Sequence, residues 1–106
     1  MRKPLLSRKS GASVHLEWTL PALGDIKDAG DFISPDSPQA AERMSERIKE
    51  AVEYLIEYPN MGRPGRVAST RELVVSGTPF VVVYRIRSPI IQILRVLHHA
   101  RKWPAK

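Results

Sequence analysis

Histidine and arginine side chains gather where the last predicted strand of the chain ends. The largely apolar run Ile90–Leu97 is followed at once by His98, His99 and Arg101. Imidazole groups exchange protons near neutral pH, and guanidinium groups bind phosphate or carboxylate oxygens. A stiff strand would therefore fix titratable and basic groups at one end of a sheet. For His98, the alternative is a structural role in which its hydrogen bonds close the strand.

The second half of the chain carries a large excess of arginine. Residues 59–106 hold nine basic residues and one acidic residue, a net charge of +8, whereas residues 13–58 hold four basic and ten acidic residues, a net charge of −6. The basic half predicts a phosphate-bearing or acidic partner, and the alternative is a plain solubilising surface. Besides Arg101, the candidate binding residues are Arg63, Arg66, Arg71, Arg85, Arg87 and Arg95.

The composition excludes several classes of protein. The chain has no cysteine, which removes disulfides, thiolate catalysis and the usual structural zinc sites, and we expect neither a metal nor a cofactor. Its 106 residues suffice for one domain but not for a two-domain enzyme with a cofactor fold. No apolar run is long enough to span a membrane, so we expect a cytoplasmic protein without a membrane partner.

Three consecutive strands are predicted between Arg71 and His98. β-Branched and aromatic residues fill the intervals, and Gly, Ser and Pro mark turns at residues 76–78 and 87–89. In the middle strand, Tyr84 lies on the same face as apolar neighbours two residues away. The last strand is apolar on both sides, which predicts a position inside the sheet.

One strand and two helices are predicted before this meander. The alternation from Val14 to Trp18 indicates a strand with one buried face. Thr19 and Ser37 are the predicted N-caps of two helices, each with Pro in its first turn, and Pro59 ends the second helix before a loop over residues 59–67. The predicted core draws on all elements: Leu16, Trp18, Leu23, Ile26, Ile33, Met44, Ile48, Val52, Leu55, Val82, Tyr84, Ile93 and Val96.

These elements predict one α+β domain. Residues 14–104 are expected to fold in the order β-α-α-β-β-β, as an antiparallel sheet packed on a helix hairpin. Residues 1–13 hold four basic residues with Ser, Gly and Pro, which predicts a flexible basic tail.

Several motifs resemble the RelE/ParE superfamily of bacterial toxins from type II toxin–antitoxin pairs. They are GRPGR followed by TREL, the strand GTPFVVVYR and the ending ILRVLHHAR, and both helical segments match in register. The resemblance extends from about Val14 to Pro104. It implies a cognate antitoxin whose flexible tail wraps and blocks the toxin in a hetero-oligomer.

The resemblance also implies one of two cellular targets. RelE-like members are ribosome-dependent mRNA endoribonucleases, and their reaction needs a base, an acid and cations that hold the phosphate. The catalytic candidates for that activity are His98, His99, Arg101 and Tyr84. However, the chain shows neither the lysine pair nor the late tyrosine of those enzymes. ParE-like members, which poison DNA gyrase, share the Leu-His-x-Ala-Arg ending.

We therefore predict a growth-inhibiting toxin that inhibits DNA gyrase; it is an enzyme only if it is RelE-like, and not if it is ParE-like. The first alternative is a RelE-like mRNA interferase, which acts on mRNA at the ribosome. The second alternative is a non-toxic, basic nucleic-acid-binding module. The chain lacks the interleaved aromatic residues that single-strand binders use for stacking, and Trp103 is the only candidate in the basic C-terminal segment.

Overall fold

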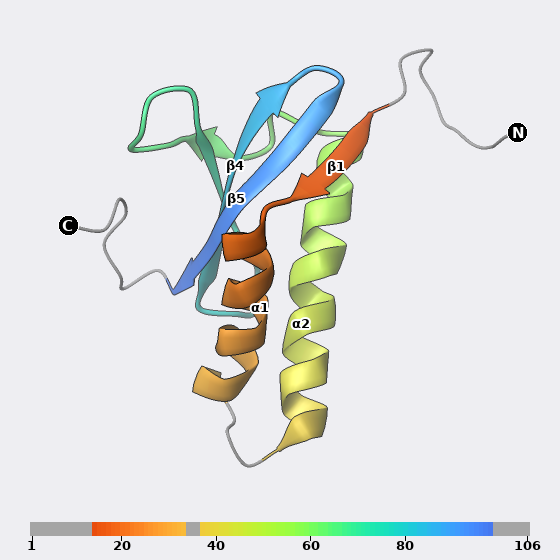
Figure 1. Cartoon of the computed structure of the whole chain (residues 1–106), viewed down its shortest axis with the longest axis vertical. Coiled ribbons are helices and arrows are strands. Elements are labelled where there is room, and N and C mark those ends of the chain that lie inside the picture. The colour runs from red at the N-terminus through yellow and green to blue at the C-terminus, as the bar shows by residue number, and fades with distance from the viewer. Residues whose placement is uncertain (1–13, 34–36, 99–106) are drawn as a thin grey trace, which may run out of the picture.

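The computed structural model describes residues 14–33 and 37–98, which form a five-stranded sheet and a hairpin of two helices (Figure 1). The strands are β1 (His15–Trp18), β2 (Arg63–Pro64), β3 (Arg71–Val74), β4 (Phe80–Arg87) and β5 (Ile90–His98). The helices are α1 (Leu20–Ile33) and α2 (Pro38–Glu53), and α2 continues into a 3₁₀ turn, η1 (Tyr54–Ile56). The predicted α+β class is confirmed, while the predicted tail, residues 1–13, lies outside the described residues.

The strand order is β1-β5-β4-β3-β2, with β5 inside the sheet as predicted. Strands β3, β4 and β5 form the predicted antiparallel meander. Two features differ from the prediction. Strand β1 pairs in parallel with β5. The two strands lie at opposite ends of the described sequence, so they are not joined by a hairpin, which would make them antiparallel. The predicted loop also contains a short strand, β2, which pairs antiparallel with β3.

Helix α1 packs against β5 through small residues. Thr19 is its N-cap, because its Oγ1 accepts a hydrogen bond from the backbone N of Ala22 at 3.2 Å. The buried side consists of Ala22, Ile26 and Ala29, which recur four and three residues apart. Leu23, predicted to lie in the core, is 48% exposed instead, because Ala22 takes the inward position in the first turn.

Helix α2 begins as predicted. The Ser37 side chain accepts a hydrogen bond from the backbone N of Ala40 at 3.2 Å, and Pro38 occupies the first helical position. Ile48 and Val52, with Leu55 in η1, are fully buried against the sheet. Among the other predicted core residues, Val82, Tyr84, Ile93 and Val96 are buried, and Leu16, Trp18 and Met44 are half-buried against the same cluster; the Ile33 side chain lies outside the described part. No helix in the described residues is long and apolar enough to cross a membrane.

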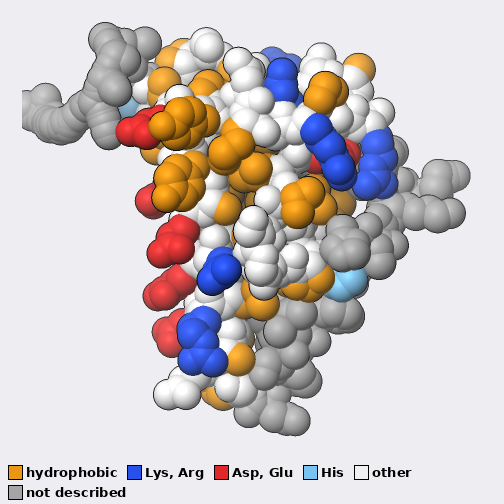
Figure 2. All heavy atoms as spheres, turned by 180° about the vertical axis from the view of Figure 1, so that it is seen from behind, with side chains coloured by type: hydrophobic (Ala, Val, Ile, Leu, Met, Phe, Trp, Pro, Cys, Tyr) orange, Lys and Arg blue, Asp and Glu red, His pale blue; other side chains and the backbone are white. Residues whose placement is uncertain are grey.

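The exposed side of α2 carries an acidic ridge, defined as Glu42, Glu46, Glu50, Glu53 and Glu57. Successive members lie three or four residues apart, so their carboxylates follow one another along the helix and its continuation. Figure 2 shows acidic side chains in a row along one border of the molecule. None of the five belongs to an ion pair within the described residues, and like charges at this spacing cost about 0.2–0.5 kcal/mol per pair.

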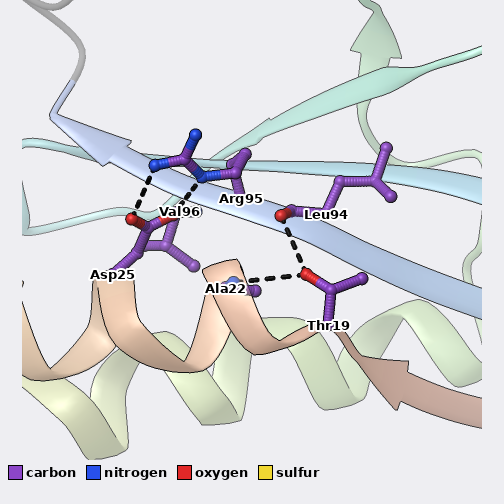
Figure 3. A network of polar contacts seen from close by, with 6 residues as sticks. All are labelled: Thr19, Ala22, Asp25, Leu94, Arg95 and Val96. Atoms are coloured by element: carbon purple, nitrogen blue, oxygen red, sulfur yellow. Dashed lines mark hydrogen bonds and ion pairs between the residues drawn. The ribbon is translucent and has the colours of Figure 1, made fainter.

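Strand β1 covers only the first part of the outer edge of β5, from Ile90 to Ile93. Beyond that point the start of α1 replaces the missing strand (Figure 3). The backbone N of Thr19 donates to Ile93 O at 3.1 Å, and its Oγ1 donates to Leu94 O at 3.0 Å. The Thr19 hydroxyl therefore caps the helix and also provides a hydrogen-bond donor for the Leu94 carbonyl at the edge of β5.

Asp25, further along α1, binds the next part of the same edge of β5. Its Oδ2 accepts a hydrogen bond from the backbone N of Val96 at 2.9 Å. The same carboxylate binds the Arg95 guanidinium through two bonds, from Nε at 2.7 Å and from Nη2 at 2.9 Å. Hydrogen bonding to the carboxylate raises the pKa of Arg95 above its already high value. Asp25 thus joins α1 to both the backbone and a side chain of β5.

Replacing Asp25 is expected to destabilise the fold. In Asp25→Ala the Val96 N–H and the Arg95 guanidinium lose their partner, so the free energy of unfolding should fall by about 1–3 kcal/mol in urea denaturation. Asp28→Ala is the matched control, because Asp28 is an exposed carboxylate of the same helix without a hydrogen bond in the described part. Equal losses in the two variants would contradict the assigned role of Asp25.

Candidate functional site

A buried carboxylate organises the basic loop, which we define as residues 59–70 between η1 and β3. The side chain of Glu72 is only 2% exposed. Its Oε1 lies 3.2 Å from Arg63 Nη2, and its Oε2 lies 3.5 Å from Arg66 Nε. The backbone N of Arg66 also donates to Oε2 at 3.1 Å. Glu72 therefore fixes both the path of the loop and the position of two arginines.

Arg63 and Arg66 keep the capacity to bind a further anion. Their side chains are 58% and 50% exposed, and together they share the single charge of Glu72. Each guanidinium has five N–H donors, of which Glu72 engages only a part. Because the loop is already ordered, binding a partner carboxylate or phosphate there would cost little additional entropy.

The first part of the basic loop is held by Tyr84 and Arg71. The Tyr84 hydroxyl donates to Pro59 O at 2.7 Å and accepts from the backbone N of Gly62 at 2.9 Å. Arg71 Nη1 donates to the carbonyl oxygens of Asn60 and Gly62. A Cβ at Gly62 would lie 2.7 Å from the Tyr84 hydroxyl oxygen, so this close approach requires glycine. Arg71, predicted to bind an anion, is thus engaged with the loop backbone.

Burial raises the pKa of Tyr84 above 10.0, and this effect exceeds the opposing effects of the Gly62 hydrogen bond and the Arg71 charge. The phenol is therefore neutral in the folded protein across the physiological range. Its predicted use as a proton carrier would require the hydroxyl to leave both Pro59 and Gly62.

Arg85 and Arg87 lie near the end of β4. Arg85 Nε donates to Gln92 Oε1 at 2.8 Å, and Gln92 Nε2 donates to Glu17 Oε1 at 2.7 Å, so the chain of bonds crosses β4, β5 and β1. Arg87 is exposed and has no hydrogen bond or ion pair among the described residues. Arg87 is consequently available to a partner, whereas Arg85 is partly engaged within the sheet, as Arg95 is with Asp25.

The predicted catalytic residues are only partly described. His98 is half-buried, and its ring meets Phe80 edge to face, with the ring centroids 5.8 Å apart. His99 and Arg101 lie outside the described residues. His98 pairs with Phe80, four residues before Tyr84 on β4, which places the two candidates roughly 13 Å apart along the strand. The structure therefore does not bring His98 and Tyr84 together.

Sequence reasoning missed two features of this region. Tyr54 and Tyr58, which precede the basic loop, are 60% and 57% exposed, and Met61 within the loop is 46% exposed. The spacing of the tyrosines, four residues apart on the polar side of the predicted helical stripe, was an available signal. The organising role of Glu72 was also missed, although it is the one acidic residue among residues 59–106.

Comparison with known proteins identifies relatives along nearly the whole chain. Residues 16–103 match the family described as ParE toxin of type II toxin–antitoxin system, parDE. The chain is 47% identical over 89 residues to the protein Y4kP of Sinorhizobium fredii, covering 84% of this chain and 92% of that protein. It is 43% identical over 84 residues to toxin RelE2 of Caulobacter vibrioides, covering 79% of this chain and 93% of that protein.

Solved structures show the same fold. The chain is similar to one in the chromosomal ParDE toxin–antitoxin system of P. aeruginosa, with a TM-score of 0.73 and 30% identity, covering 80% of this chain and 95% of that chain. It is also similar to a chain of the intact E. coli RelBE toxin–antitoxin complex, with a TM-score of 0.57 and 12% identity, covering 79% and 94%. The second likeness concerns the fold alone.

Tyr84→Phe is expected to lower the free energy of unfolding by about 1–3 kcal/mol, because Pro59 O and Gly62 N lose their partner. The pKa of Tyr84 is higher in the folded than in the unfolded state, so the neutral phenol stabilises the fold below about pH 10 and this stabilisation is lost as the pH rises further. Urea denaturation from about pH 8 to pH 11 should show this loss in the wild type and a smaller one in Tyr84→Phe.

The matched control is Tyr58→Phe, whose phenol is exposed and has no hydrogen bond in the described part of the chain. Its alkaline loss of stability should equal that of the wild type. If the free energy of unfolding of Tyr84→Phe fell between about pH 8 and pH 11 as steeply as that of the wild type, the loss could not be assigned to Tyr84.

Proposed function

Because the chain belongs to the ParE toxin family of type II toxin–antitoxin systems, we propose that it arrests bacterial growth by inhibiting DNA gyrase and that a cognate antitoxin neutralises it in the cytoplasm. The observation that carries this proposal is the family match over residues 16–103, which includes both helices and every strand except the first residue of β1. The 30% identity to a chain of a ParDE system supports it independently of that match.

The arrangement of the described side chains supports a binding protein over a ribonuclease. A ribonuclease needs an acid, a base and phosphate-binding cations within reach of one phosphodiester. Tyr84 is bonded to the basic loop, and His98 packs against Phe80 at the other end of β4. Inhibition by binding needs only an exposed surface, which Arg63 and Arg66 provide.

The charge of the basic loop supports an acidic segment in the antitoxin. Carboxylates of such a segment would meet the half-exposed guanidiniums of Arg63 and Arg66, whose positions Glu72 has already fixed. Exposed charges of this kind steer association and are screened by salt over about 8 Å at physiological ionic strength. The 30% identity to a chain of a solved ParDE toxin–antitoxin system supports an antitoxin as the partner.

A RelE-like mRNA endoribonuclease is the second candidate, and the 43% identity to a protein named toxin RelE2 favours it. In that case His98, His99 and Arg101 would carry the reaction at the end of β5. The phosphate would then be held by arginines that do not already pair with Asp25 or with the loop backbone.

Expression of the chain alone should arrest growth, and co-expression with the antitoxin encoded beside it should restore growth. The reason is that the free toxin would reach its target, whereas the complex would cover the binding surface. Optical density and colony counts measure the effect, and a gene carrying an early stop codon is the control. Normal growth in cells that accumulate the folded protein would contradict the toxin assignment.

Purified protein should inhibit gyrase supercoiling or trap cleaved DNA, and cells expressing it should filament while their messages stay intact. Agarose gels of plasmid topology and primer extension on cellular messages provide the two measurements. His98→Ala should retain gyrase inhibition if the protein acts by binding. Ribosome-dependent message cleavage that His98→Ala abolishes, with unaffected gyrase, would establish the second candidate instead.

A further inference from the structure

Three large apolar side chains are exposed together where α2 ends, and we call Tyr54, Tyr58 and Met61 the tyrosine strip. Their exposed fractions are 60%, 57% and 46%. The two tyrosines lie four residues apart, on the same side of the last turns. The backbone N of Met61 donates to Tyr58 O at 3.0 Å, which holds the turn against the helix end. An exposed apolar patch with a charged rim is typical of an interaction surface.

The two sides of the tyrosine strip carry opposite charges. Glu53 and Glu57, the last members of the acidic ridge, alternate with the tyrosines along the chain. Arg63, with Arg66 beyond it, begins two residues after Met61 on the basic loop. Figure 2 shows this order across one face of the molecule, from a row of acidic side chains, over hydrophobic side chains, to a group of basic side chains.

The tyrosine strip also spans the border between the two charged halves of the chain. Residues 13–58 carry a net charge of −6, and residues 59–106 carry +8. A two-fold axis through the strip would place Glu53 and Glu57 of one copy opposite Arg63 and Arg66 of the other. Such an isologous contact is self-complementary in charge, and its centre would consist of tyrosines, which are frequent hot-spot residues.

From this pattern we propose that the protein forms a homodimer through the tyrosine strip. Tyr54, Tyr58 and Met61 of the two copies pack on each other at the centre. At each side, Glu53 and Glu57 of one copy face Arg63 and Arg66 of the other. This contact also gives Glu53 and Glu57 the counter-charges that they lack within the described residues of one copy. The proposal does not depend on whether gyrase or mRNA is the target, but it uses the same Arg63 and Arg66 as the proposed function, so the dimer would compete with a partner bound there.

The charges beside the tyrosine strip distinguish a second copy from a nucleic acid. Exposed tyrosines beside arginines could stack on the bases of a single strand. However, the carboxylates of Glu53 and Glu57 flank the same tyrosines and would repel the phosphates of such a strand. A protein surface that presents both signs of charge satisfies both sides of the strip, and the chain itself carries such a surface.

Analytical ultracentrifugation of the purified full chain over a range of concentrations tests the proposal. The wild type should show a monomer–dimer equilibrium. The double variant Tyr54→Ser with Tyr58→Ser should raise the dimer Kd at least about tenfold. Glu53→Lys with Glu57→Lys should also raise the dimer Kd, because the new lysines would repel Arg63 and Arg66 of the other copy.

The matched control is Glu42→Lys with Glu46→Lys, which makes the same charge change on the same ridge, far from the tyrosines. Its Kd should stay within about twofold of the wild type. Circular dichroism verifies that each variant is folded, and the charge variants decide the outcome if the tyrosine variant does not fold.

Three results would overturn the homodimer. The first is a wild type that stays monomeric at every concentration, and the second is a dimer whose Kd neither double variant changes. The third is a monomer whose tyrosine variant loses binding to the co-expressed antitoxin or to a labelled single-stranded oligonucleotide, which would assign the strip to that other partner.

Discussion

The edge of β5 that β1 leaves uncovered is the constraint from which the arrangement of the domain follows. Backbone N–H and C=O groups at that edge need partners, since unpaired buried groups are costly. The chain supplies them from one helix, through Thr19 and Asp25. These bonds fix where α1 begins and which side it turns inward, so that Ala22 and Ile26 face the sheet. Helix α2 then packs beside α1. The basic loop that follows it lies at the opposite edge of the sheet, where β2 pairs with β3.

Much of the basic charge of the chain serves the fold before it serves any partner. Arg95 binds Asp25, Arg71 binds loop carbonyls, and Arg63 and Arg66 share Glu72. An arginine count from the sequence therefore exceeds the charge that is free to attract an anion. The half-exposed guanidiniums of Arg63 and Arg66 are ordered, because Glu72 holds both of them in a fixed position. That order favours specific recognition over diffuse electrostatic attraction.

The sequence predicts the regular elements well, because periodicity and caps are local properties. Thr19 and Ser37 begin their helices as predicted, and β5 lies inside the sheet as its apolar faces require. The resemblance to the RelE/ParE superfamily is confirmed by the family match. The parallel pairing of β1 with β5 could not be predicted, because strand direction depends on contacts between distant segments. The bonds of Tyr84 and Glu72 to the basic loop depend on tertiary contacts in the same way. The sequence therefore predicted which residue types belong to the site, but not how their side chains are arranged.

The position of β5 also bears on the order in which the protein can assemble during synthesis. It is the last strand in the described sequence, yet it lies between β1 and β4 and provides the edge on which α1 docks. The contact between Thr19 and Leu94 closes a separation of 75 residues. Such non-local contacts slow folding and cannot form while the later segment is still inside the ribosome. Chains interrupted before β5 would lack the strand that joins β1 and α1 to the rest of the sheet, so the ability to act would appear only once translation of β5 is complete.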